Sequence, residues 1–133
     1  MNEKKILIFE DEWNTIKGSF ELANIYAFES KLSFVNKTKS QDITYDSWRE
    51  LYDAVFVDIT LAKNTKWDGF NIIKVIHDTN LFPLNKVVVL TGNSKVEEKL
   101  NEMGINKDLV KILYKPINFE ILAKELHRVL NVV

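Results

Sequence analysis

The chain has 133 residues, 46% of them hydrophobic, which is enough for one domain with a buried core. A formal net charge of −1 leaves no basic surplus to neutralise phosphates, so direct nucleic-acid binding is not expected. The absence of cysteine excludes disulfides and thiolate metal sites. The first apolar run, Ile6–Phe9, is too short for a signal peptide or a membrane span. We therefore expect a cytoplasmic protein with no membrane contact.

Short apolar segments alternate with segments of helical periodicity along the whole chain. The short segments are rich in β-branched residues and predict strands at Lys5–Phe9, Lys31–Asn36, Ala54–Asp58, Lys86–Thr91 and Val110–Lys115. Apolar residues spaced by three and four predict helices at Glu12–Ser30, Thr44–Asp53, Gly69–Thr79, Lys95–Met103 and Phe119–Leu130. This alternation predicts an α/β fold, a doubly wound parallel sheet with helices on both faces, in a single domain over residues 1–133.

Three helix starts have recognisable capping residues. Asp68 and Asn118 are expected to cap the third and fifth helices. Ser94 and Glu97 have the spacing of a capping box for the fourth helix. In the fifth helix, the apolar spacing predicts that Ile121 faces the core along with three later residues.

The predicted strands end on polar side chains, and they do so at one edge of the sheet. In chain order these residues are Glu10, Asp11 and Glu12 after the first strand, then Asp58, Thr91 and Lys115. Taken singly, each is an ordinary residue for a turn or a strand end. Because the carboxyl ends of parallel strands meet, we expect these side chains to form one cluster where ligands bind.

The composition of this cluster favours phosphoryl chemistry. Crowded carboxylates repel one another unless a cation is present, and oxygen ligands of this kind suit Mg²⁺ or Mn²⁺. A carboxylate such as Asp58 can act as a nucleophile and form an aspartyl-phosphate. The Thr91 hydroxyl and the Lys115 ammonium could then bind the phosphoryl oxygens and stabilise charge during transfer.

Five segments in this order resemble the receiver domain of two-component response regulators, and the resemblance spans nearly the whole chain. The matching segments are "KILIFEDE", "YDAVFVDIT", "DGFNIIKVI", "VVVLTGNS" and "ILYKPIN". The resemblance implies a flavodoxin-like sheet of five parallel strands in the order 2-1-3-4-5. It also implies that the peptide bond between Lys115 and Pro116 is cis.

The resemblance also assigns roles to the residues of the cluster. It implies that Asp58 is the phosphoacceptor, that Thr91 is the switch hydroxyl and that Lys115 binds the phosphoryl group. The implied ligands of Mg²⁺ or Mn²⁺ are the side chains of Glu10, Asp11 and Asp58 and the backbone carbonyl of Thr60.

The same resemblance implies a signalling role and no separate enzymatic activity. A sensor histidine kinase or a phosphotransfer protein would donate the phosphoryl group, and the chain would assist its own phosphorylation and autodephosphorylation. The modified domain would then alter the face formed by Lys95–Met103, Val110–Lys115 and Phe119–Leu130, where a downstream effector protein binds. This face is also the usual homodimer interface of the family. Because no output domain follows Leu130, we expect a stand-alone receiver.

Three features depart from the common pattern of the family, one of them being extra residues in "GINKDLVKILYKP", between the fourth helix and the fifth strand. Ile112 stands where an aromatic switch residue is usual, and Tyr114, two residues later, points to the same face of the strand. The segment after Asp58 is also longer than usual and contains Trp67, which could either anchor a partner or pack on its own domain.

These departures leave one main alternative, a degenerate receiver that binds partners without phosphorylation. An aspartate-nucleophile phosphatase is disfavoured because Thr60 stands where such enzymes carry a second aspartate. A flavodoxin-like electron carrier is disfavoured because Glu10, Asp11 and Glu12 would repel a phosphate after the first strand.

Overall fold

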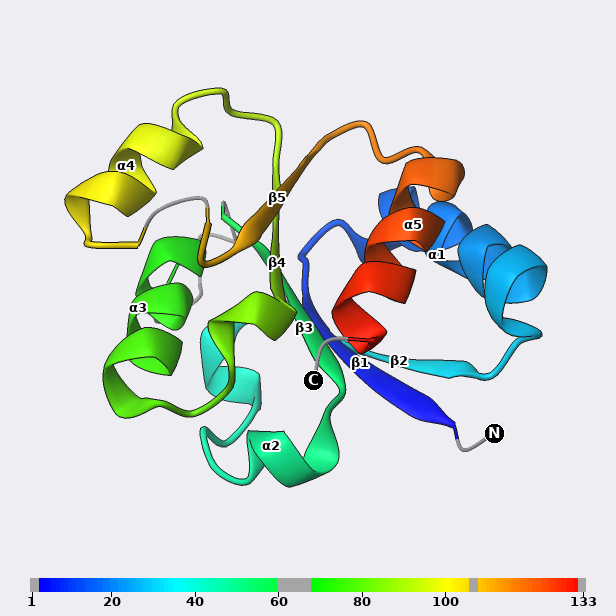
Figure 1. Ribbon diagram of the computed structural model, residues 1–133, viewed down its shortest axis with the longest axis horizontal. Coiled ribbons are helices and arrows are strands. Elements are labelled where there is room, and N and C mark those ends of the chain that lie inside the picture. The colour runs from blue at the N-terminus through cyan, green and yellow to red at the C-terminus, as the bar shows by residue number, and fades with distance from the viewer. Residues whose placement is uncertain (1–2, 60–67, 106–107, 132–133) are drawn as a thin grey trace.

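The computed structural model describes residues 3–59, 68–105 and 108–131. Strands and helices alternate along the chain (Figure 1). The strands are β1 (Lys4–Phe9), β2 (Leu32–Lys37), β3 (Ala54–Asp58), β4 (Val87–Thr91) and β5 (Lys111–Tyr114). The α-helices are α1 (Trp13–Phe28), α2 (Trp48–Leu51), α3 (Gly69–Thr79), α4 (Val96–Glu102) and α5 (Phe119–Leu130). Two short 3₁₀ turns, η1 (Ser40–Asp42) and η2 (Leu84–Lys86), complete the description.

The strands form one parallel sheet in the order β2-β1-β3-β4-β5, which confirms the predicted fold class and strand order. The peptide bond between Lys115 and Pro116 is cis, also as expected. In a parallel sheet every strand ends at the same edge, so the polar residues that follow β1, β3, β4 and β5 share one side of the domain.

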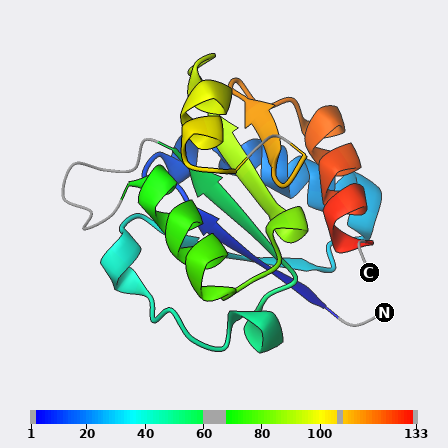
Figure 2. The ribbon, with the colours of Figure 1, turned by 60° about the vertical axis from the view of Figure 1, so that its left-hand side comes forward.

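Helices cover both faces of the sheet (Figures 1 and 2). An apolar layer lies between the sheet and the helices on each face. One layer joins α1 and α5 to the sheet. It includes Phe20 and Phe56, whose ring centroids lie 5.3 Å apart in an edge-to-face arrangement. The other joins α2, α3 and α4 to the opposite face and includes the fully buried Trp48. Burial of each large apolar side chain contributes about 1.5–3 kcal/mol to the free energy of folding. Together the two layers hold β3 rigidly in the middle of the sheet.

The second helix is much shorter than predicted. The expected helix at Thr44–Asp53 is reduced to Trp48–Leu51. Ser47 has a positive φ of 61°, so the backbone before Trp48 cannot continue an α-helix. The Trp48 indole instead donates a hydrogen bond to the Thr44 carbonyl at 2.8 Å, which fixes the preceding turn.

The predicted caps are confirmed for α3 and α5 but not for α4. The Asp68 side chain accepts a hydrogen bond from Asn71 N, and that of Asn118 accepts from Glu120 N and Ile121 N. The capping box predicted at Ser94 is wrong, because α4 begins at Val96, one residue later than a cap at Ser94 requires. Its preceding turn is held by Asn93, whose side chain accepts from Lys95 N at 2.8 Å.

The side chain of Ile121 is 58% exposed, which contradicts the expectation that it faces the core. The buried stripe of α5 instead follows Leu122, Leu126 and Val129, at i, i+4 and i+7. Ile121 lies one residue, or about 100°, away from this stripe. Across the described parts of the chain, none of the helices combines the length and apolar character needed to cross a membrane.

Candidate functional site

The site is built around Asp58, the last residue of β3. This carboxylate is 2% exposed, and its strand pairs with β1 on one side and β4 on the other. The backbone just beyond it is fixed by a hydrogen bond from Ile59 N to Leu90 O at 3.1 Å and another from Gly69 N to Ile59 O at 3.1 Å. Asp58 therefore has little freedom to move away from the edge of the sheet.

Two carboxylates from the end of β1 lie beside Asp58. Glu10 is fully buried and Asp11 is exposed, and one oxygen of each lies within 4.8 Å of one Asp58 oxygen and of each other. Glu10 is held by its surroundings. Its N–H donates to Lys37 O at 3.0 Å, its carbonyl accepts from the Asn36 side chain at 3.0 Å, and its Oε1 accepts from Glu12 N at 2.9 Å.

Lys115 brings a positive charge to this acidic cluster. Its Nζ lies 2.7 Å from Glu10 Oε2 and 3.5 Å from Asp58 Oδ2. Burial lowers the pKa of the Lys115 ammonium, but the hydrogen bond to Glu10 and the charges of Asp58 and Glu10 outweigh burial and raise it above its usual value. The ammonium is therefore charged at neutral pH.

Thr91 ends β4 on the neighbouring strand and is 2% exposed. Its hydroxyl oxygen accepts a hydrogen bond from Asn93 N at 2.9 Å, and its carbonyl accepts from Lys115 N at 2.7 Å. The threonine is thus linked by hydrogen bonds to the turn that leads into α4 and to the lysine of the site.

The donor set fits the hard divalent cation that the sequence predicts. One oxygen of each of the three carboxylates lies within 4.8 Å of an oxygen of the other two. The carboxylates follow β1 and β3, two adjacent strands that the sheet holds rigidly. Mg²⁺ and Mn²⁺ both prefer oxygen ligands of this kind. Glu10, Asp11 and Asp58 are therefore the residues that could hold such an ion.

The remaining sequence predictions have different outcomes. Thr60, the predicted carbonyl ligand, and Trp67 both lie outside the described residues. Ile112 packs against the apolar layer on the α3 and α4 face, while Tyr114 is 45% exposed and its hydroxyl donates to Glu97 Oε1 at 3.2 Å. Tyr114 is therefore a surface residue that links β5 to α4.

Sequence reasoning missed the structural role of Gly69. A Cβ atom added there would lie 2.3 Å from Asp58 O and 2.5 Å from Ile59 Cα, so only glycine fits without displacing backbone. A glycine at the first position of a predicted helix, directly after a capping aspartate, was the available signal.

No family model and no curated protein matches this chain. Solved structures resemble it closely in fold. A putative response regulator from Chloroflexus aurantiacus J-10-fl has a TM-score of 0.70 and 19% identity, covering 98% of this chain and 100% of that one. The BeF₃-activated N-terminal receiver domain of Klebsiella pneumoniae RstA has a TM-score of 0.67 and 21% identity, covering 97% and 100%. Vibrio cholerae chemotaxis protein CheY4 has a TM-score of 0.65 and 18% identity, covering 96% and 98%.

These likenesses extend over nearly the whole chain in each comparison. The protein therefore has the fold of the response regulator receiver domains, with five parallel strands in the order 2-1-3-4-5. Its acidic cluster stands at the carboxyl edge of that sheet.

Proposed function

We propose that the chain is a receiver that accepts a phosphoryl group on Asp58 from a histidine kinase or a phosphotransfer protein. The observation that carries the proposal is the grouping of Asp58 with Glu10, Asp11 and Lys115 at one edge of a receiver fold. A buried carboxylate beside an ammonium and two further carboxylates is suited to accept a phosphoryl group and to bind the cation that the transfer needs.

In the proposed reaction, a carboxylate oxygen of Asp58 attacks phosphorus, the P–N bond of the donor phosphohistidine breaks, and the released imidazole takes up a proton. Lys115, 3.5 Å from Asp58 Oδ2, would bind a phosphoryl oxygen and stabilise the charge developing on it. Glu10 and Asp11 would hold Mg²⁺ or Mn²⁺ together with Asp58. The bound cation would offset the repulsion between these carboxylates and the incoming phosphoryl group.

Thr91 would carry the signal away from Asp58. Its hydroxyl is bound by Asn93 N, and Asn93 in turn fixes the turn before α4. A phosphoryl group on Asp58 offers strong acceptor oxygens to the Thr91 O–H, and rotation of the hydroxyl toward them would move its oxygen away from Asn93 N. Rotation of Thr91 would therefore disturb this turn and change the face formed by α4, β5 and α5, the proposed contact for an effector protein or a second copy.

We further propose that residues 1–133 act as one receiver domain in the cytoplasm, with no direct contact to nucleic acid or membrane. Receiver domains are in general signalling domains rather than enzymes, and this chain would assist only its own phosphorylation and dephosphorylation. The fold and the charge of −1 support this assignment.

The test is intact-mass measurement after incubation with acetyl phosphate, with and without Mg²⁺. We expect one added phosphoryl group that requires the divalent cation and is lost in Asp58→Asn. The matched control is Asp78→Asn, which alters an exposed aspartate of α3 and should leave phosphorylation unchanged. Added mass that persists in Asp58→Asn would contradict the assignment of the acceptor.

One observation favours a second candidate, the degenerate receiver that binds partners without phosphorylation. Ile112 occupies the usual position of the aromatic switch and packs against a core layer, so it cannot move as an aromatic switch does. If the chain neither gains mass nor binds beryllofluoride in the presence of Mg²⁺, this second function replaces the first.

A further inference from the structure

Asn36 links the ends of β1 and β2 at the edge of the sheet where Asp58 lies. It is the next-to-last residue of β2 and pairs in register with Ile8 of β1. Its Nδ2 donates one hydrogen bond to the Ile8 carbonyl at 3.3 Å and another to the Glu10 carbonyl at 3.0 Å. Glu10 N in turn donates to Lys37 O at 3.0 Å. Both backbone polar groups of Glu10 are therefore bound to β2.

The hydrogen bond from Asn36 fixes the peptide unit between Glu10 and Asp11. The Glu10 carbonyl and the Asp11 N–H belong to one planar unit, so a donor on the carbonyl sets the direction in which the chain leaves β1. On the other side of Asp11, Glu12 N donates to Glu10 Oε1 at 2.9 Å. The backbone of Asp11 is thus held from both sides.

The Asp11 side chain depends on this backbone for its place in the site. It is exposed, and within the described part of the chain it makes no hydrogen bond or ion pair of its own. One of its oxygens nevertheless lies within 4.8 Å of an oxygen of Glu10 and an oxygen of Asp58. The other two carboxylates both contact the Lys115 ammonium. Asp11 therefore needs its peptide unit to be oriented if it is to meet a cation beside them.

We propose that Asn36 is a positioning residue for the cation site. Its amide orients the peptide unit between Glu10 and Asp11, so that the Asp11 carboxylate stands beside Glu10 and Asp58 before a cation arrives. Groups that orient the ligands of a metal in this way commonly decide how tightly the metal is bound. The inference rests on the proposed cation site, but it does not require phosphorylation of Asp58.

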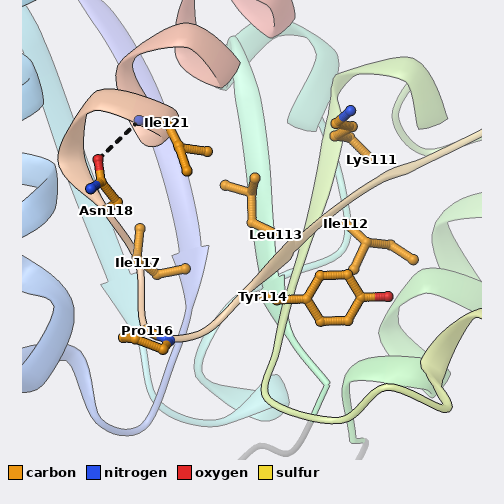
Figure 3. Close-up of a pocket in the computed structure, with 8 residues that line it drawn as sticks. All are labelled: Lys111, Ile112, Leu113, Tyr114, Pro116, Ile117, Asn118 and Ile121. Atoms are coloured by element: carbon orange, nitrogen blue, oxygen red, sulfur yellow. Dashed lines mark hydrogen bonds between the residues drawn. The ribbon is translucent and has the colours of Figure 1, made fainter.

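Asn36 lies at the opposite edge of the sheet from the proposed effector face. β2 and β5 are the two end strands of the order β2-β1-β3-β4-β5. Figure 3 shows the surface beside β5, where the side chains of Leu113, Ile117 and Ile121 gather. A substitution at Asn36 therefore tests the cation site while that surface stays as it is.

The test is calorimetric titration of the full, unphosphorylated chain with Mg²⁺, in the wild type and in Asn36→Ala. The matched control is Asn24→Ala, because Asn24 also makes two bonds to the backbone of β2. Its Nδ2 donates to Leu32 O at 3.1 Å, and its Oδ1 accepts from Leu32 N at 3.0 Å. Leu32 begins β2, at the end away from Asp11. Circular dichroism checks that both variants fold.

We expect Asn36→Ala to bind Mg²⁺ about tenfold more weakly than the wild type, and Asn24→Ala to bind it with unchanged affinity. A purely structural role of Asn36 would lower the stability of both variants and leave both Mg²⁺ affinities unchanged.

A second measurement needs no variant and holds even if Asn36→Ala fails to fold. Relaxation of ¹⁵N in the wild-type chain without cation reports on the N–H of Asp11, which lies in the peptide unit that Asn36 binds. We expect an order parameter of about 0.85 for this N–H, the value of rigid backbone.

Three results would overturn the inference while leaving the cation site in place. One is equal Mg²⁺ affinity in the wild type and Asn36→Ala. Another is an equal loss of affinity in Asn24→Ala. The third is an order parameter below about 0.6 for the Asp11 N–H, because the peptide unit would then be mobile before the cation binds. If the wild type binds no Mg²⁺ at all, the proposed cation site fails and the inference fails with it.

Discussion

Gly69 and Gly18 provide a paired test of how the backbone behind Asp58 is packed. A Cβ at Gly69 would meet Asp58 O at 2.3 Å and Ile59 Cα at 2.5 Å, both backbone atoms that no rotamer change can move. A Cβ at Gly18, in the middle of α1, would meet no atom within 4 Å. The same substitution to alanine should therefore have opposite effects at the two positions.

The magnitudes follow from packing and helix propensity. Gly69→Ala forces α3 and the end of β3 apart, and such overpacking costs about 1–3 kcal/mol. Gly18→Ala adds no clash and removes the entropy cost of a helical glycine, so it should gain about 0.5–1 kcal/mol. At about 3–5 °C per kcal/mol for a domain of this size, Tm should fall by at least about 3 °C in the first variant and rise by about 2–5 °C in the second.

Urea unfolding followed by circular dichroism measures both free energies under the same conditions. If Gly69→Ala were as stable as the wild type, the close approach of α3 to the Asp58 carbonyl would be refuted. We also expect Gly69→Ala to be phosphorylated more slowly, because the shift displaces Asp58 from Lys115.

Three further predictions concern the site, the alkaline limit and a helix cap. Lys115→Ala should bind Mg²⁺ about tenfold more tightly by calorimetry, because a cation that neutralises Glu10 is lost, and yet accept the phosphoryl group more slowly. Burial raises the pKa of the Tyr45 hydroxyl in the folded chain, so the unfolded chain loses the hydroxyl proton at lower pH. The free energy of unfolding should therefore fall as pH rises above about 10. Tyr45→Phe should reduce this fall when urea unfolding is measured between about pH 9 and pH 11. Asn118→Ala should lower the free energy of unfolding by about 1 kcal/mol in the same assay, because two N–H groups of α5 lose their acceptor.

Each of these three predictions has a matched control variant. Lys17→Ala alters an exposed lysine of α1 and should leave Mg²⁺ affinity unchanged; weaker binding in Lys115→Ala would contradict the charge argument. Tyr26→Phe, which removes the hydroxyl of a side chain that is 74% exposed, is the matched control for Tyr45→Phe. Asn118→Asp keeps an acceptor oxygen and should retain the stability that Asn118→Ala loses.

Much of the fold could be predicted because its signals are local. The limits of β3 were predicted to the residue, since a continuous apolar run ending in a carboxylate has a clear boundary. The caps Asp68 and Asn118 were also found, because a capping side chain bonds to backbone two or three residues away. The helix at Thr44–Asp53 was overestimated because its periodicity does not reveal the positive φ of Ser47.

By itself, the sequence determined the alternation of strands and helices, and hence which polar residues stand at the carboxyl edge of the sheet. Tertiary structure alone decided that Lys115 lies nearer to Glu10 than to Asp58, that Gly69 touches the Asp58 carbonyl, and that β5 pairs with β4 at one end of the sheet. These facts depend on contacts between residues far apart in the chain. Hydrophobic periodicity specifies which face of an element is buried, but the distances between elements are set only when the whole core packs.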